Sequence, residues 1–160
     1  MKIYLGSDHA GFELKEKLKS YLTQLGHEIE DKGAFKLDPE DDYPDFIRPV
    51  AEAVATGPEN RGIVIGFGGQ GEAITANRVK GIRAIVYYGE PQAVSQMGSK
   101  REDKAKDVIL LSREDNNANV LALAAGFVSP EEAQKIVKRW LETPFSGEPR
   151  HQRRIKKIDE

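Results

Sequence analysis

The sequence contains no cysteine among its 160 residues. This absence excludes disulfide bonds, thiolate metal sites and a cysteine nucleophile. The chain also lacks an apolar run of the ~20 residues that a membrane-spanning helix needs. No signal-peptide pattern follows the first methionine. The sequence therefore predicts a cytoplasmic protein that does not associate with a membrane.

A large excess of charge of one sign is also lacking. The chain has 24 Lys and Arg against 26 Asp and Glu, for a formal net charge of −2. Without a basic electrostatic field, nucleic acid is not an expected partner. Histidine is scarce as well, with three in the chain. None of them has the spacing of metal ligands, so the sequence predicts no metal site.

Strand-like and helix-like segments alternate along the whole chain. The expected strands cover residues 2–6, 27–31, 62–66, 82–88 and 119–124. The expected helices cover residues 12–25, 43–55, 72–78 and 131–141, with a further helix in the tail from residue 148. The stretch 92–112 has no clear pattern, and its part 98–107 has loop character.

Repeated strand–helix units predict an α/β fold with three layers, α/β/α. We expect a Rossmann-like parallel sheet of about five strands, in one domain over residues 1–160. Ligands of such sheets bind beyond the carboxyl ends of the strands. This rule selects two loops, residues 7–11 after the first strand and residues 67–71 after the third.

The glycine-rich segment GFGGQGE, residues 66–72, allows a ligand to approach the backbone closely. Its free N–H groups suit a phosphate or the oxyanion of an enediolate. Glu72 is placed to reach a bound substrate, or alternatively only complements the helix dipole. A second alternative is dinucleotide binding, because Gly66, Gly68 and Gly71 spell G-x-G-x-x-G and Glu90 lies near the end of the next strand.

Two further polar groups stand out. Asp8 and His9 lie between a strand and a helix, where a carboxylate and an imidazole can share proton transfer and sugar-hydroxyl contacts. The alternative is that Asp8 caps the helix and His9 is a surface residue. In the tail, Arg150 and Arg154 share one helical face and can bind one phosphate together. The alternative is a solvated, charge-rich terminus.

Five blocks occur in order over nearly the whole chain, namely GSDHAGFELK, DYP, GQGEAITANRVKGIRA, SREDNNANVLAL and RHQRRI. Together they resemble the ribose-5-phosphate isomerase B family, which includes allose-6-phosphate and galactose-6-phosphate isomerases. The resemblance argues against dinucleotide binding. It implies an aldose–ketose isomerase that interconverts ribose 5-phosphate and ribulose 5-phosphate through a cis-enediolate. It also implies that no metal or cofactor takes part, and that a dimer or tetramer shares its active sites between subunits.

The resemblance also assigns roles to individual residues. Glu72 is the implied base at C2, and Asp115 stands where the family has its ring-opening histidine. The implied substrate contacts are Asp8 on the ring hydroxyls, Asn116 on the open chain, Tyr43 at the entrance, and the backbone amides of Gly68, Gly69, Gln70 and Gly71 on the enediolate. His9 is the implied phosphate ligand, with Arg150 and Arg154 carried in by the tail, residues 148–160, of a partner subunit.

Three departures from the family pattern favour alternatives. Asp115 replaces the histidine, Gly126 stands where the family has a third phosphate-binding arginine, and Gly68 replaces a Ser or Thr after the bulky Phe67. The charged stretch 98–107 offers Lys100 or Arg101 as a replacement cation, or a lid. The alternatives are a different sugar or hexose phosphate, a non-phosphorylated sugar, or a non-catalytic relative that binds sugar phosphates.

Overall fold

The structure is a computed structural model that describes residues 1–90 and 107–160. Its centre is a five-stranded sheet in the order β2-β1-β3-β5-β4, and all four strand pairs are parallel. The strands are β1 (Lys2–Ser7), β2 (Glu28–Asp31), β3 (Arg61–Gly66), β4 (Ala84–Tyr87) and β5 (Val120–Ala124). The predicted parallel sheet of about five strands is confirmed.

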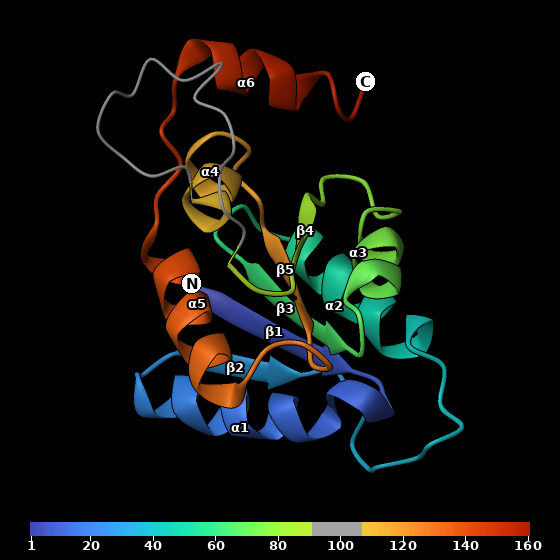
Figure 1. The fold of residues 1–160 in the computed structure, drawn as a ribbon. Helices are drawn as coiled ribbons and strands as arrows, with labels where there is room; N and C mark the ends of the chain where they lie inside the picture. Colours follow the sequence, from blue (N-terminus) through green and yellow to red (C-terminus); the bar gives the residue numbers. More distant parts are fainter. Residues whose placement is uncertain (91–106) are drawn as a thin grey trace.

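Helices cover both faces of this sheet (Figure 1). In chain order they are the 3-10 turn η1 (His9–Gly11), α1 (Phe12–Gln24), α2 (Pro44–Ala55), α3 (Gln70–Ala76), α4 (Val108–Glu114), α5 (Pro130–Glu142) and α6 (Pro149–Lys156). Helices α1 and α5 pack on one face, with α4 against α5, and α2 and α3 pack on the other. The predicted three-layer α/β/α architecture is confirmed.

Local sequence explains most of these elements. Strands β3 and β5 are buried at every position, which matches their continuous apolar character. Helix α5 begins where the Ser129 side chain accepts a hydrogen bond from the Glu132 amide, with Pro130 at the first helical position. Helix α2 likewise has Pro44 in its first turn, and it continues through Pro49.

Two expectations about element bounds were wrong, and one helix was not predicted. Helix α3 begins at Gln70, two residues before the expected start, because Gly69 adopts the left-handed conformation at its N-cap (φ 75°). Strand β4 is shorter than expected. Helix α4 was not predicted, and it begins where Asp107 caps the Ile109 amide. Residues 98–106, including the suggested cations Lys100 and Arg101, lie outside the described residues.

The two edges of the sheet have different contents. We call the edge where the parallel strands end the carboxyl edge, and the opposite one the amino edge. Strands β3 and β5 pair Gly62 with Val120 and Gly66 with Ala124. A segment that follows Gly66 therefore lies at the carboxyl edge, and a segment that precedes Val120 lies at the amino edge. Within the described ranges, no helix is long and apolar enough to cross a bilayer.

A buried ion pair fixes the loop that follows β2 at the carboxyl edge. The ammonium group of Lys15 on α1 is inaccessible to solvent and contacts the Asp31 carboxylate at 2.7 Å. It also donates to the Ala34 carbonyl at 2.7 Å. The Ala34 amide in turn donates to the Ser7 carbonyl at the end of β1. These contacts connect β1 to the loop that leads into the acidic segment 38–42.

Candidate active site

The glycine loop, residues 67–69, follows β3 and leads into α3 at the carboxyl edge. Gly69 is buried, and a β-carbon there would lie 2.8 Å from the Val86 side chain. A β-carbon on Gly71 would lie 2.8 Å from the Tyr43 ring. Glycine is therefore required at both positions by close packing, and at Gly69 also by its positive φ. Gly68 has no such neighbour, and its backbone faces open space.

Glu72 lies in the first turn of α3, directly after the glycine loop, with its side chain turned back toward the end of β3. It is 5% exposed, and a β-carbon on Gly66 would lie 1.8 Å from its Oε1 atom. Burial raises the pKa of the Glu72 carboxyl, and the nearby Asp8 charge raises it further. Hydrogen bonds from the backbone amides of Glu72 and Gly69 oppose this rise in pKa. Glu72 is thus a buried carboxylate with a raised pKa, as a general base requires.

Asp8 and His9 are at the same edge, directly after β1. Asp8 is buried, and its Oδ1 accepts a hydrogen bond from the Gly11 amide at 3.1 Å. Asp8 therefore caps η1, as the alternative interpretation held, while its charge also acts on Glu72. A β-carbon on Gly11 would lie 2.4 Å from the Ile65 carbonyl, so Gly11 lets η1 pack closely against β3.

His9 is not an isolated surface residue. Its Nδ1 atom lies 2.6 Å from Oδ1 of Asp41, and its backbone amide donates to the same oxygen at 3.0 Å. Hydrogen bonding to Asp41 raises the pKa of His9, and the charges of Asp8, Asp41 and Glu40 add to this effect against the desolvation of the ring. Asp41 was not among the sequence candidates.

Two departures noted in the sequence contact each other. The Phe67 ring covers Gly126, where a β-carbon would lie 2.7 Å from a ring carbon. Phe67 also packs edge-to-face on Phe127, with ring centroids 5.8 Å apart. Both aromatic side chains are exposed. The position where the family pattern has an arginine is thus occupied by the ring of Phe67.

The remaining candidates lie at the amino edge. Asp115 and Asn116 follow α4 and precede β5, so they are at the opposite end of the strands from Glu72. Helix α6 begins beside them, since Nε2 of His151 lies 3.4 Å from Oδ1 of Asp115. It ends near the start of β4, where Asp159 accepts a hydrogen bond from the Gly81 amide at 3.1 Å.

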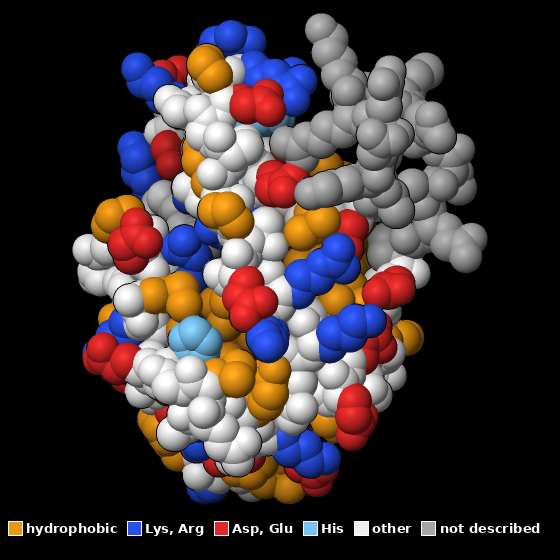
Figure 2. Space-filling view, turned by 90° about the vertical axis from the view of Figure 1, so that its left-hand side faces the viewer, with side chains coloured by type: hydrophobic (Ala, Val, Ile, Leu, Met, Phe, Trp, Pro, Cys, Tyr) orange, Lys and Arg blue, Asp and Glu red, His pale blue; other side chains and the backbone are white. Residues whose placement is uncertain are grey.

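Helix α6 therefore extends along the amino edge of its own chain, far from the glycine loop (Figure 1). Lys and Arg side chains gather at this end of the molecule (Figure 2). Arg154 is exposed. The Nε atom of Arg150 contacts Glu148 at 2.7 Å and His151 at 3.1 Å. The predicted site residues of one chain thus lie in two groups at opposite edges of its sheet.

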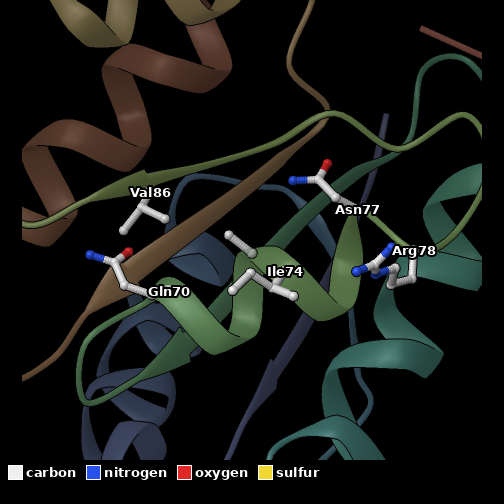
Figure 3. Close-up of a pocket in the computed structure, with 6 residues that line it drawn as sticks. Gln70, Ile74, Asn77, Arg78 and Val86 are labelled. Atoms are coloured by element: carbon white, nitrogen blue, oxygen red, sulfur yellow. The ribbon is translucent and has the colours of Figure 1, made fainter.

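A cavity of about 420 Å³ lies on the outer side of α3, between this helix and β4 (Figure 3). It is lined by Gln70, Ala73, Ile74, Asn77, Arg78 and Val86. Gln70 stands at its glycine-loop end and Arg78 at the other. Glu72 is not among the lining residues. It is two positions from the exposed Ile74 on α3, so the two side chains point to opposite sides of the helix. Among the described residues, no group of three or more His, Asp or Glu side chains could hold a metal ion.

The structure brings one part of the predicted set together and separates the rest. Asp8, His9, Tyr43, Glu72 and the amides of residues 68–71 meet at the carboxyl edge. Asp115, Asn116, Arg150 and Arg154 are at the amino edge. The one added residue, Asp41, belongs to an acidic run in which the sequence gives no signal to single out one carboxylate.

Several known proteins are similar to this chain over nearly its whole length. The family model described as Ribose/Galactose Isomerase matches residues 3–158. A ribose-5-phosphate isomerase B of Mycolicibacterium paratuberculosis is 41% identical over 155 residues, which cover 97% of this chain and 87% of that protein. The structure of a Clostridium thermocellum ribose-5-phosphate isomerase B has a TM-score of 0.84 at 40% identity, covering 99% of this chain and 95% of that one. A Mycoplasma genitalium ribose-5-phosphate isomerase B solved with bound ribulose-5-phosphate has a TM-score of 0.83 at 36% identity, covering 98% of this chain and 93% of that one.

Proposed function

The chain belongs to the ribose/galactose isomerase family, and from this premise we propose that it is an aldose–ketose isomerase of a phosphorylated sugar. The substrate pair is ribose 5-phosphate and ribulose 5-phosphate. The similar Mycoplasma genitalium protein was solved with the ketose of this pair, ribulose-5-phosphate, bound. The observation that carries the proposal is the buried carboxylate of Glu72, held inside a glycine loop beside a second carboxylate, Asp8.

The reaction moves one proton from C2 to C1 and a second proton from O2 to O1, and it needs no external oxidant or reductant. Glu72 removes the C2 proton and returns it to C1 of the enediolate, because its raised pKa suits a group that both accepts and donates a proton. The backbone amides of residues 68–71 stabilise the negative charge that develops on the substrate oxygens. Asp8 orients the sugar hydroxyls, and Tyr43 lines the entrance beside Gly71.

The phosphate is bound by His9 together with Arg150 and Arg154 of a second copy of the chain. In this arrangement the residues at the carboxyl edge and those at the amino edge are the two halves of a shared site. Their separation within one chain supports it, since α6 lies at the amino edge of its own subunit. In a symmetric dimer the amino-edge half-site of each copy completes the carboxyl-edge half-site of the other, which gives two equivalent sites. Asp115 and Asn116 accompany α6 in this arrangement, so they also act on the substrate bound by the partner.

Isotope exchange tests the reaction. The protein is incubated in D₂O with ribose 5-phosphate, allose 6-phosphate, galactose 6-phosphate and unphosphorylated ribose, and deuterium at C2 is followed by NMR. We expect exchange and ketose formation with ribose 5-phosphate, and none with ribose. Exchange with a hexose phosphate alone would move the assignment to that sugar. Thermal stabilisation by every sugar phosphate without exchange would instead identify a binding protein.

A further inference from the structure

Asp41 belongs to the acidic segment 38–42 and meets His9 at two points. Its Oδ1 atom lies 2.6 Å from Nδ1 of the imidazole and accepts the His9 backbone N–H at 3.0 Å. The Asp41 side chain is only 8% exposed. Its second oxygen, Oδ2, is buried and has no hydrogen-bond partner within residues 1–90 and 107–160.

This geometry determines which nitrogen of His9 faces Asp41 and which one faces outward. An ionised carboxylate only accepts hydrogen bonds, so the short contact requires a proton on Nδ1. The Nε2 atom is then the free end of the ring. In a neutral ring Nε2 would be an acceptor and would repel a phosphate, whereas in the imidazolium it is a donor. The protonation state of His9 therefore decides whether the ring attracts or repels an anion.

The surroundings of Asp41 favour the charged ring. A buried carboxylate is costly unless a cation or several hydrogen bonds compensate it. In the described part of the chain, the Asp41 carboxylate forms its ion pair with His9. Both hydrogen bonds that this carboxylate accepts come from His9. The other charged groups that act on His9 are Asp8 from its own loop and Glu40 from the acidic segment, and both are negative.

We propose that Asp41 is a positioning residue, which holds the His9 ring in one orientation and keeps it cationic so that Nε2 donates to the substrate phosphate. The inference rests on the proposed function, because that function supplies the phosphate. Its consequence for pH has a definite sign. Hydrogen bonding to Asp41 raises the pKa of His9 above 6.5, so phosphate binding is present at lower pH and weakens as the pH rises through that raised pKa.

The test compares wild type with D41N, which keeps the shape and an acceptor oxygen but removes the charge. The three histidines of the uniformly ¹⁵N-labelled protein are titrated by NMR, and His9 is assigned with H9Q. We expect the His9 titration midpoint to fall in D41N. The matched control is E40Q, which removes the same charge one residue away and should move the His9 midpoint much less.

Kinetics give a second readout that a structural role would not reproduce. At about pH 7.5, D41N should raise KM for the sugar phosphate by about tenfold with a smaller change in kcat. The difference in KM should shrink toward about pH 5.5, where the imidazole is protonated without help from Asp41. An equal rise in KM at every pH, or an unchanged His9 midpoint in D41N, would overturn the inference.

The inference stays testable if D41N does not fold. In the wild-type protein the ¹⁵N shifts should show both ring nitrogens of His9 protonated at about pH 6.5, and a neutral His9 at that pH contradicts the proposal. The titration does not depend on turnover. A normal His9 result without any isomerase activity would therefore count against the proposed function alone, and full activity with a neutral His9 would count against the role of Asp41 alone.

Discussion

The carboxylate of Glu72 occupies the space that a side chain on Gly66 would need. A β-carbon on Gly66 would lie 1.8 Å from Oε1 and 2.3 Å from Cδ of Glu72. The three nearest atoms to that β-carbon all belong to the Glu72 carboxylate. Glycine at position 66 and glutamate at position 72 therefore form one unit, and a larger residue at 66 cannot coexist with Glu72 in this orientation.

The variant G66A should displace the base while sparing the fold. The three atoms nearest to its β-carbon are the end of one side chain, so we expect the carboxylate to move rather than the strand, and alanine in a strand costs less entropy than glycine. We expect kcat for C2 exchange to fall about 100-fold or more, with an unchanged melting temperature. In G66A/E72Q the loss should equal that of E72Q alone, since both changes remove the same group. Retention of full exchange by G66A would show that Glu72 is not the base.

Replacement of Glu72 itself should have opposite effects on activity and stability. E72Q should lower kcat by about 10²–10⁴-fold, the usual contribution of a general base. Because the folded-state pKa of Glu72 is raised, the ionised carboxylate is disfavoured in the folded protein at neutral pH. E72Q should therefore raise the melting temperature at about pH 7. A lower melting temperature would argue that the pair of Glu72 and Asp8 stabilises the fold.

The pH dependence of turnover follows from the same pKa shift. Glu72 must be ionised to accept a proton, so kcat should fall on the acid side at a pH above 4.5, the ordinary value for glutamate. The Asp8 charge contributes to the rise, so D8N should move this acid limb to lower pH. The measurement is a profile of kcat against pH for both proteins. An acid limb at the same pH in D8N would show that the Asp8 charge does not affect the pKa of Glu72.

The contact between Phe67 and Gly126 predicts how an additional phosphate ligand can be introduced. In G126R alone the new side chain meets the Phe67 ring, since its β-carbon would lie 2.7 Å from a ring carbon. In F67G/G126R the space is open, and one charge-assisted hydrogen bond to phosphate is worth about 1.5–3 kcal/mol. We expect the double variant to lower KM for ribose 5-phosphate by about tenfold or more, and the single variant to gain less. Equal gains would show that the ring does not obstruct position 126.

Much of the fold was predictable because it depends on local patterns. Continuous apolar runs identified β1, β3 and β5, and Pro130 marked the start of α5. Helix α4 was not predicted because its seven residues are too few to show a helical period, and because its start depends on the Asp107 side chain. The start of α3 was predicted wrongly because it depends on the positive φ of Gly69.

The sequence predicted which loops lie together at the carboxyl edge, but not how their side chains are arranged. The sequence named Asp8, His9 and Glu72 correctly as neighbours at one edge, because parallel strands bring their carboxyl ends together. It did not show that Phe67 covers Gly126, since 59 positions separate them and only the tertiary fold joins them. It also did not show which acidic residue contacts His9, because that choice depends on how one loop packs.

Subunit complementation tests the central claim most directly, namely that Glu72 of one copy works with α6 of the other. One subunit carries E72Q and a second, differently tagged subunit carries R150Q/R154Q, and each homodimer should be nearly inactive. In the purified heterodimer one site collects all the substitutions while the other is intact, so about half of the wild-type activity should return. A heterodimer no more active than its parents, at normal dimer stability, would contradict the shared site.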